Sequence, residues 1–281
     1  MDAEVRDENI GQEMQLIENL PFETDNGIAA RGRVGLIVLA SDYTIEHEWR
    51  QIFAHLPGLA LYQSRIFNDN QITPDTLRAM EPRIRDCADV FLPGADMDVI
   101  AYGCTSASMA IGEEKVFQRI REARPGVSCT TPITAAFAAF DAFKARKIGV
   151  LTPYRADVNR IVADYIRARG FDVPVFGSFN EESDAVVSSI SPKSIRAGVK
   201  RVLTNSDVDA IFVSCTSVRL VEEAASIEQE TGIPITSSNH AMAWHTARLA
   251  GVNDKLPQFG KLVRRFGMRA VLMAGFSVSA L

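Results

Sequence analysis

The stretch DVIAYGCTSAS, from Asp98 to Ser108, recurs as DAIFVSCTSVR, from Asp209 to Arg219. Both copies read Asp-x-Ile, three further residues and then Cys-Thr-Ser, so the match extends beyond the apolar residues of an ordinary buried strand. The chain has only four cysteines and uses two of them at equivalent places in this pattern. The repeat therefore indicates an internal duplication, in which each copy forms a buried strand that ends in a polar turn.

Two further landmarks flank this strand in both halves of the chain. Ahead of it, RVGLIVLASDY (33–43) resembles KIGVLTPYRAD (147–157); behind it, GVSCTTPITA (126–135) resembles GIPITSSNHA (232–241). The landmarks keep their order, and helix-start signals such as Thr73-Pro74 stand between them. Strands that alternate with helices predict an α/β fold of two pseudo-symmetric lobes, each a mainly parallel sheet flanked by helices.

The same landmarks predict the domain organisation. The first α/β lobe is expected over 32–143, completed by 240–281, and the second lobe over 144–239. Residues 1–31 are polar without clear periodicity, which predicts an N-terminal extension that wraps the fold or is partly disordered. The apolar stretch at 270–281 is too short to span a bilayer, so we expect it to form a docked helix or strand.

Composition and charge exclude several classes of partner. A net charge of −5, a pI near 5.5 and the absence of a basic run with interleaved aromatic residues argue against binding to nucleic acid or to an anionic membrane. The N-terminal MDAEVRDENIGQEM has no apolar core of a secretory signal. Four cysteines without such a signal predict reduced thiols and a cytoplasmic location.

The two Cys-Thr-Ser turns are expected to meet in one cleft. Ligands of open α/β sheets bind beyond the carboxyl ends of the strands, where Cys104, Cys215, Asp42 and Tyr154 all fall. If the lobes face each other, this inter-lobe cleft is the active site, and the two thiols approach one ligand from opposite sides. Each turn is also expected to lead into a helix whose N–H groups and dipole favour thiolate.

Two opposed thiols suit proton transfer at a carbon next to a carboxylate. One thiolate removes the proton while the other thiol returns a proton to the opposite face, so the substrate is racemised or epimerised. The hydroxyl and amide groups of the two turns are then expected to bind the substrate carboxylate. These candidate substrate-binding residues are Thr105, Ser106, Thr216 and Ser217.

Other chemistry-bearing residues have plain structural interpretations. Cys87 and Cys129 fit an apolar helix stripe and a short strand, and so are expected to be structural. Asp42 fits a helix cap near Thr44 as well as a site residue, and Tyr154 fits a turn as well as a ligand contact. The histidines at 240 and 245 have a metal-binding spacing but no third ligand in the pattern, and no Gly-rich phosphate loop is present. We therefore expect neither a metal nor a cofactor.

GLIVLASD, DVIAYGCTSASM, IGVLTPY and DAIFVSCTSVR resemble the aspartate/glutamate racemase superfamily over about residues 33–250, in the branch of maleate cis–trans isomerase and arylmalonate decarboxylase. The resemblance implies two α/β lobes and cofactor-independent chemistry on small carboxylates. It also implies that Cys104 and Cys215 are the catalytic pair and that Tyr154 and Asn180 contact the substrate. Arylmalonate decarboxylase keeps only the second cysteine, so Cys104 argues against that activity.

One departure from the maleate isomerase pattern bears on the substrate. Those enzymes usually read Ser-Asn-Thr after the first strand, whereas this chain has Asp42 after Ser41. A carboxylate there repels a dicarboxylate and favours an ammonium group, and the stretch from Leu39 to Glu46 also resembles the ectoine-utilisation subgroup of the superfamily. We therefore predict a racemase or epimerase of a small amino acid or derivative.

Two other functions remain open at this point: a maleate-type cis–trans isomerase and a non-catalytic sensor of small carboxylates. Apolar residues at positions 137, 140 and 143, all phenylalanine, also make a homo-oligomer plausible, although their spacing of three fits core packing equally well.

Overall fold

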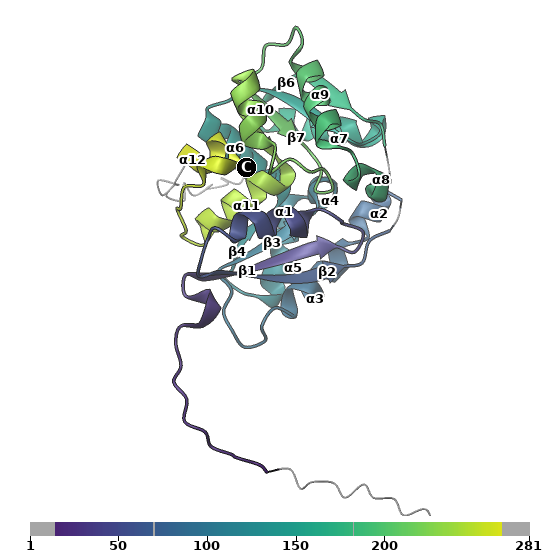
Figure 1. Cartoon of the computed structure of the whole chain (residues 1–281). Helices are drawn as coiled ribbons and strands as arrows, with labels where there is room; N and C mark the ends of the chain where they lie inside the picture. Colours follow the sequence, from purple (N-terminus) through teal and green to yellow (C-terminus); the bar gives the residue numbers. More distant parts are fainter. Residues whose placement is uncertain (1–14, 70, 182, 266–281) are drawn as a thin grey trace, which may run out of the picture.

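The computed structural model describes residues 15–69, 71–181 and 183–265, and contains two four-stranded sheets (Figure 1). The sheets have equivalent strand orders, β2-β1-β3-β4 and β6-β5-β7-β8, and all paired strands are parallel. The α/β fold with two pseudo-symmetric lobes is thereby confirmed. The strands are β1 (Gly32–Leu39), β2 (Leu59–Ile66), β3 (Val99–Gly103), β4 (Ser128–Thr130), β5 (Lys147–Thr152), β6 (Asp172–Ser178), β7 (Ala210–Val213) and β8 (Ile235–Ser237).

Helices connect the strands and cover both sheets. Thr73, Thr131 and Ser191 each cap a helix that begins with proline, and each cap oxygen accepts a backbone N–H from the first turn. The helices are α1 (Ile45–Phe53), α2 (Pro74–Arg78), α3 (Ile84–Asp89), α4 (Thr105–Ile111), α5 (Glu113–Ala123), α6 (Pro132–Phe143), α7 (Ala156–Ala168), α8 (Asp184–Ser188), α9 (Pro192–Leu203), α10 (Ala224–Thr231), α11 (Ser238–Leu249) and α12 (Lys261–Arg265).

The aspartate that opens each repeat holds the sheet together. Asp98 Oδ2 accepts the backbone N–H of Arg33 at 2.7 Å, which ties the start of β3 to the start of β1. In the second lobe, Asp209 Oδ2 accepts the N–H groups of Arg146 and Lys147 at 2.7 and 2.8 Å. The repeated aspartate is therefore structural: in each lobe it ties the start of the central repeat strand to the start of the neighbouring strand.

The helix that follows the last strand of each sheet, α6 or α11, packs against the other half. The α6 side chains of Phe137 and Phe140 lie in the apolar core of the second lobe, where Phe140 makes an edge contact with Phe212 at 5.6 Å between ring centroids. In return, α11 contributes Met242 and Trp244 to the core of the first lobe. The two helices also contact each other extensively and lie near the centre of the molecule (Figure 1). This exchange joins the lobes along one apolar seam.

The exchange also accounts for the phenylalanines at positions 137, 140 and 143. The first two are buried and the third packs against the same core cluster, so all three are used within one chain. They no longer argue for a homo-oligomer, which stays a prediction.

Three elements differ from the sequence-based expectations. The partly buried edge strand β2 was not predicted, and the helix expected after the first Cys-Thr-Ser is two helices that meet at Gly112, whose φ of 92° breaks the helix. The helix expected after the second Cys-Thr-Ser is α10, but it begins only at Ala224, after turns and bends over 216–223, so its N-terminus does not follow Cys215 directly as α4 follows Cys104.

Residues 15–26 have no regular secondary structure and extend away from the two lobes instead of wrapping them (Figure 1). Phe22, for example, is 85% exposed. The expectation for 270–281 falls outside the described residues. Within the described part of the chain, no helix is long and apolar enough to cross a membrane.

Candidate active site

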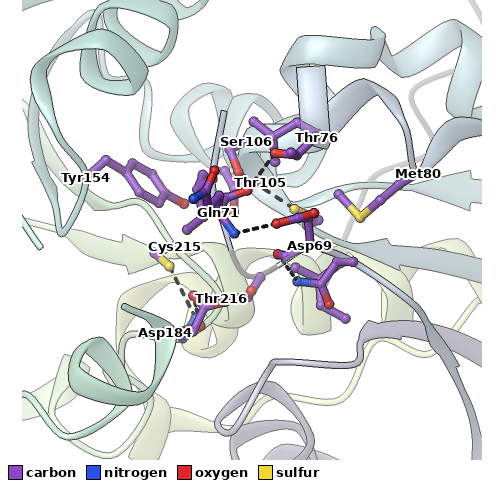
Figure 2. Close-up of a pocket in the computed structure, with 16 residues that line it drawn as sticks. Asp69, Gln71, Thr76, Met80, Thr105, Ser106, Tyr154, Asp184, Cys215 and Thr216 are labelled. Carbon is purple, nitrogen blue, oxygen red and sulfur yellow. Dashed lines mark hydrogen bonds between the residues drawn. The ribbon is translucent and has the colours of Figure 1, made fainter. Parts of the chain in front are cut away.

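Both cysteines of the repeat line one cavity between the lobes. Cys104 follows β3 and Cys215 follows β7, the third strands in the order of their sheets. Every predicted residue of the two turns lines this cavity, together with Tyr154 after β5 (Figure 2). The cavity volume is about 30 Å³, which leaves room for about two water molecules. A substrate can enter only if segments that line the cavity move apart. The predicted residues in the lining are Cys104, Thr105, Ser106, Tyr154, Cys215, Thr216 and Ser217.

Cys104 caps the N-terminus of α4. Its Sγ accepts the backbone N–H of Ala107 at 3.4 Å and lies 3.7 Å from Ser106 Oγ. Burial raises the pKa of this thiol to about 12, although those two hydrogen bonds lower it in part. The N–H of Ala107 in α4 thus favours thiolate, as expected, but desolvation outweighs it and the thiol is neutral in this cavity.

Cys215 has a similar pKa for partly different reasons. Burial and the charge of Asp184 raise the pKa of its thiol to about 12. A hydrogen bond with Tyr154 and the backbone N–H of Ser217, 3.4 Å from Sγ, act in the opposite direction. Tyr154 is itself buried, and burial raises its pKa well above the usual value, so its hydroxyl is protonated and able to donate. Both thiols are thus neutral, each with donors already directed at the sulfur.

Ser238 connects the two turns, although sequence reasoning missed it. Its Oγ accepts the hydroxyl of Thr105 at 2.8 Å and the backbone N–H of Cys215 at 3.0 Å. It is the first residue of α11 and fully buried. The first-lobe counterpart in the repeat is Pro132, so the loss of symmetry at this position is the signal that could have marked it.

Asp184 is a second missed residue, and it lies at the start of α8. Its Oδ2 accepts the hydroxyl of Ser41 at 2.7 Å and its Oδ1 that of Ser217 at 3.2 Å, and its side chain lines the cavity (Figure 2). The segment after β2 contributes further lining residues, including Asp69 and Gln71. Their signal was hidden because neither β2 nor α8 was recognised in the sequence.

Asp42 lies beside the cavity but does not line it. The carboxylate is 4% exposed, and its Oδ1 accepts the N–H groups of Thr44 and Ile45 at 2.7 and 2.8 Å, as a helix cap does. Burial raises its pKa, and hydrogen bonds from Ile45, Thr216 and Thr44 offset part of that rise. Its negative charge contributes to the raised pKa of both cysteines.

Asn180 is not brought to the cavity. It is exposed with a left-handed φ of 55°, and its backbone N–H donates to Ser178 Oγ at 2.9 Å. A different asparagine, Asn68, lines the cavity and donates from Nδ2 to Ser41 Oγ at 2.8 Å. Nothing local in the sequence distinguishes these two loop asparagines.

The remaining cysteines and the α11 histidines lie outside the cavity lining. The thiols of Cys87 and Cys129 are free and contact backbone carbonyl groups. His240 and His245 contact threonine hydroxyls through Nδ1, at 3.1 and 2.8 Å, and burial lowers the pKa of each to about 4. Among the described residues, no group of three histidine, cysteine or acidic side chains is placed to hold a metal ion.

Comparison with known proteins covers both lobes. The family model described as "Arylmalonate decarboxylase" matches residues 34–263. The chain belongs to the arylmalonate decarboxylase family. The predicted superfamily and branch are thereby confirmed, whereas the ectoine-utilisation subgroup stays a prediction.

Relatives of this family include both isomerases and a decarboxylase. Maleate isomerase of Nocardia farcinica is 27% identical over 245 residues, covering 83% of this chain and 96% of its own. Maleate isomerase of Alcaligenes faecalis is 28% identical, covering 82% and 96%. Arylmalonate decarboxylase of Bordetella bronchiseptica is 25% identical, covering 83% and 97%.

Solved structures share the fold. A Nocardia farcinica maleate cis–trans isomerase mutant with a covalently bound succinylcysteine intermediate superposes with a TM-score of 0.76 at 24% identity, covering 84% of this chain and 99% of that chain. The maleate isomerase of Pseudomonas putida S16 gives a TM-score of 0.75 at 24% identity, covering 83% and 98%.

Proposed function

We propose that the chain is a cofactor-independent isomerase that racemises or epimerises a small amino acid or derivative by proton transfer between Cys104 and Cys215. The observation that carries this proposal is the pair of thiols in one cavity, supplied by equivalent strands of opposite lobes. Inversion at a carbon requires a base on one face and an acid on the other, and a duplicated fold supplies two such groups.

In the proposed reaction, one cysteine thiolate removes the α-proton, and the electron pair left on carbon is delocalised into the substrate carboxylate. The opposite thiol then donates its proton to the other face and becomes the thiolate, so the number of protons in the site is unchanged. Hydroxyl groups of the two turns are expected to bind the carboxylate where negative charge grows. The reverse reaction exchanges the roles of the two cysteines.

The charges around the cavity favour an amino acid over a dicarboxylate. Asp69 and Asp184 line it, and no described lining residue is arginine, lysine or histidine. A dicarboxylate would bring two negative charges to these carboxylates, whereas a substrate ammonium group would be attracted to them. The same ammonium charge lowers the pKa of a nearby thiol and so helps to form the thiolate that burial disfavours.

The direct test is α-proton exchange in heavy water. Small D- and L-amino acids and their acetylated forms would be incubated with the protein, and deuterium at the α-carbon measured by mass spectrometry. The proposal predicts incorporation together with formation of the opposite configuration for at least one substrate. Substrate conversion without incorporation of solvent deuterium would contradict it.

A maleate-type cis–trans isomerase is the second candidate, favoured by the relatives named maleate isomerase. In that reaction one thiolate adds to the double bond, the resulting C–C single bond rotates, and the thiolate leaves. A mass increase equal to maleate on the Cys104 peptide, trapped in Cys215→Ser, would support this reaction over racemisation.

A further inference from the structure

The backbone after each catalytic-site cysteine is held in a different way. After Cys104 the chain enters α4, where the N–H of Ser108 donates to the carbonyl of Cys104 at 3.1 Å. After Cys215, residues 216–221 form no helix, and we name this segment the Cys215 turn. Buried backbone groups need partners, so those of the Cys215 turn must find them outside a helix.

First-lobe side chains supply several of these partners. Glu48 of α1 accepts the N–H groups of Leu220 and Val221 on the same oxygen, Oε1, at 2.5 and 2.7 Å. Its other oxygen, Oε2, accepts Nδ2 of Asn239 at 2.7 Å, and this Nδ2 also donates to the carbonyl of Thr216 at 2.7 Å. Glu48 is 2% exposed and Asn239 is fully buried, so no bulk water competes for these hydrogen bonds.

Thr44 adds a fourth connection from the same helix start. Its hydroxyl donates to the carbonyl of Ser217 at 2.9 Å. Ser217 in turn directs its N–H at the sulfur of Cys215, 3.4 Å away. The position of this N–H donor therefore depends on a turn that the opposite lobe holds in place.

We propose that Glu48 is a positioning residue for Cys215: its carboxylate bridges the lobes and fixes the turn whose N–H group faces the Cys215 sulfur. The inference rests on the proposed role of Cys215. It assigns to Glu48 a task that α4, which begins directly after Cys104, performs for that cysteine.

Burial of the Glu48 carboxylate has an energetic cost that an apolar side chain at the same position would avoid. Burial raises the pKa of Glu48 from 4.5 to about 7, with the charge of Asp42 acting in the same direction, while the hydrogen bonds from Val221, Asn239 and Leu220 lower it. A leucine would fill similar space without that cost, but it would leave two amide groups and Asn239 without their acceptor.

The test is the rate at which iodoacetamide alkylates each cysteine, followed by peptide mass spectrometry. Glu48→Ala removes every acceptor, whereas Glu48→Gln keeps Oε1 for the two amides and turns an NH₂ group toward Asn239. We expect Cys215 to be alkylated at least 10-fold faster in Glu48→Ala and a few-fold faster in Glu48→Gln, because the turn opens. The rate at Cys104 should stay unchanged.

Glu228→Gln is the matched control. Glu228 is also a buried carboxylate that accepts two backbone N–H groups, from Ile235 at 3.0 Å and Lys261 at 2.6 Å. Glu228→Gln should not change the ratio of the alkylation rate at Cys215 to that at Cys104. If Glu48→Ala fails to fold, Asn239→Ala removes the link to Thr216 and should also raise alkylation at Cys215 alone.

An unchanged ratio in the Glu48 variants, or an equal rise at both cysteines, would overturn the proposal. Alkylation needs no substrate, so this result stands apart from the proposed isomerase activity. Where a substrate is found, Glu48→Gln should lower kcat about 10-fold with little change in KM, because the turn orients a reacting thiol more than it binds substrate. A KM effect alone would count against the assignment.

Discussion

The two Cys-Thr-Ser turns have the same sequence and follow equivalent strands, but they differ in how they are supported. The Cys104 turn continues into α4, so its backbone is held mainly by hydrogen bonds within its own segment, with one link from Thr105 to Ser238. The Cys215 turn makes no helix and depends on Glu48, Thr44 and Asn239, which lie elsewhere in the chain. A duplicated motif therefore preserves the strand and the thiol, while the support of each thiol depends on its surroundings.

This difference suggests that the lobes are not equivalent partners. The Cys104 turn belongs to one lobe, whereas the Cys215 turn is part of the interface between lobes. Ser238 strengthens this connection, since it receives a hydrogen bond from each turn. A substitution that disturbs the interface between the lobes is therefore expected to alter the position and reactivity of Cys215 more than those of Cys104.

The largest expected effect comes from removal of either thiol. Cys104→Ser and Cys215→Ser should each lower α-proton exchange by about 10³-fold, because a serine hydroxyl is a far weaker acid than a thiol and is scarcely ionised to act as a base. Cys87→Ser, which changes a free thiol outside the cavity lining, should leave the rate unchanged. Loss of exchange in only one of the two cavity variants would show that the thiols are not an acid–base pair.

A pH dependence of stability is expected to distinguish the two supports. The pKa of Glu48 is raised to about 7 in the folded protein, so the folded state holds a proton that the unfolded chain releases near its ordinary value of 4.5. The stability associated with this proton is complete below pH 4.5 and is lost as pH rises through 7, a change of about 3 kcal/mol. Backbone hydrogen bonds in α4 do not titrate.

The measurement is the free energy of unfolding in urea from pH 4.5 to 8, compared between the parent protein and Glu48→Gln. The difference in the free energy of unfolding between the parent protein and Glu48→Gln should change by about 3 kcal/mol between pH 4.5 and 8. If the two proteins showed the same dependence of unfolding free energy on pH, Glu48 would not hold a proton in the folded state up to about pH 7.

Removal of the link between the turns should have a smaller effect. Ser238→Ala leaves the N–H of Cys215 and the hydroxyl of Thr105 without their buried acceptor, which costs about 2 kcal/mol in the free energy of unfolding. The exposed Ser189, changed to alanine in the same way, should alter stability by less than about 0.5 kcal/mol. Equal effects of the two variants would remove Ser238 as a connection between the lobes.

The smallest expected effect concerns the charge of Asp184. This charge raises the pKa of both cysteines, but Asp184 is linked directly to the Cys215 turn, because its Oδ1 accepts the hydroxyl of Ser217 at 3.2 Å. Asp184→Asn should therefore lower the pKa of Cys215 more than that of Cys104, and its alkylation at pH 9 should become a few-fold faster. A larger response at Cys104 would contradict the asymmetry of the two sites.

Local sequence signals predicted much of this architecture, and their failures have physical causes. Apolar runs and capped Pro helices were recognised because their patterns depend on neighbouring residues, as at Thr73 and Ser191. The edge strand β2 was missed because its sequence, LALYQSRI, begins apolar and then turns polar, so it shows neither a continuous apolar run nor a strict alternation. Because β2 was not recognised, Asp69 and Gln71, which follow this strand and line the cavity, were not recognised either.

The choice of site residues shows the same division. The cysteines, their Thr-Ser neighbours and Tyr154 follow strand ends, and parallel sheets gather such ends at one edge. Asn180 and Asn68 both lie in polar loops, and only the path of the chain brings the second to the cavity.

By itself, the sequence determined the duplicated α/β lobes and the meeting of the two cysteine turns, because strand burial and repeat order are encoded locally. Tertiary structure alone decided that α6 and α11 exchange lobes, that both thiols are neutral in the closed cavity, and that Glu48 holds the Cys215 turn. Those properties depend on which distant groups share a buried volume, and burial sets both the pKa of a thiol and the need of an amide for a partner.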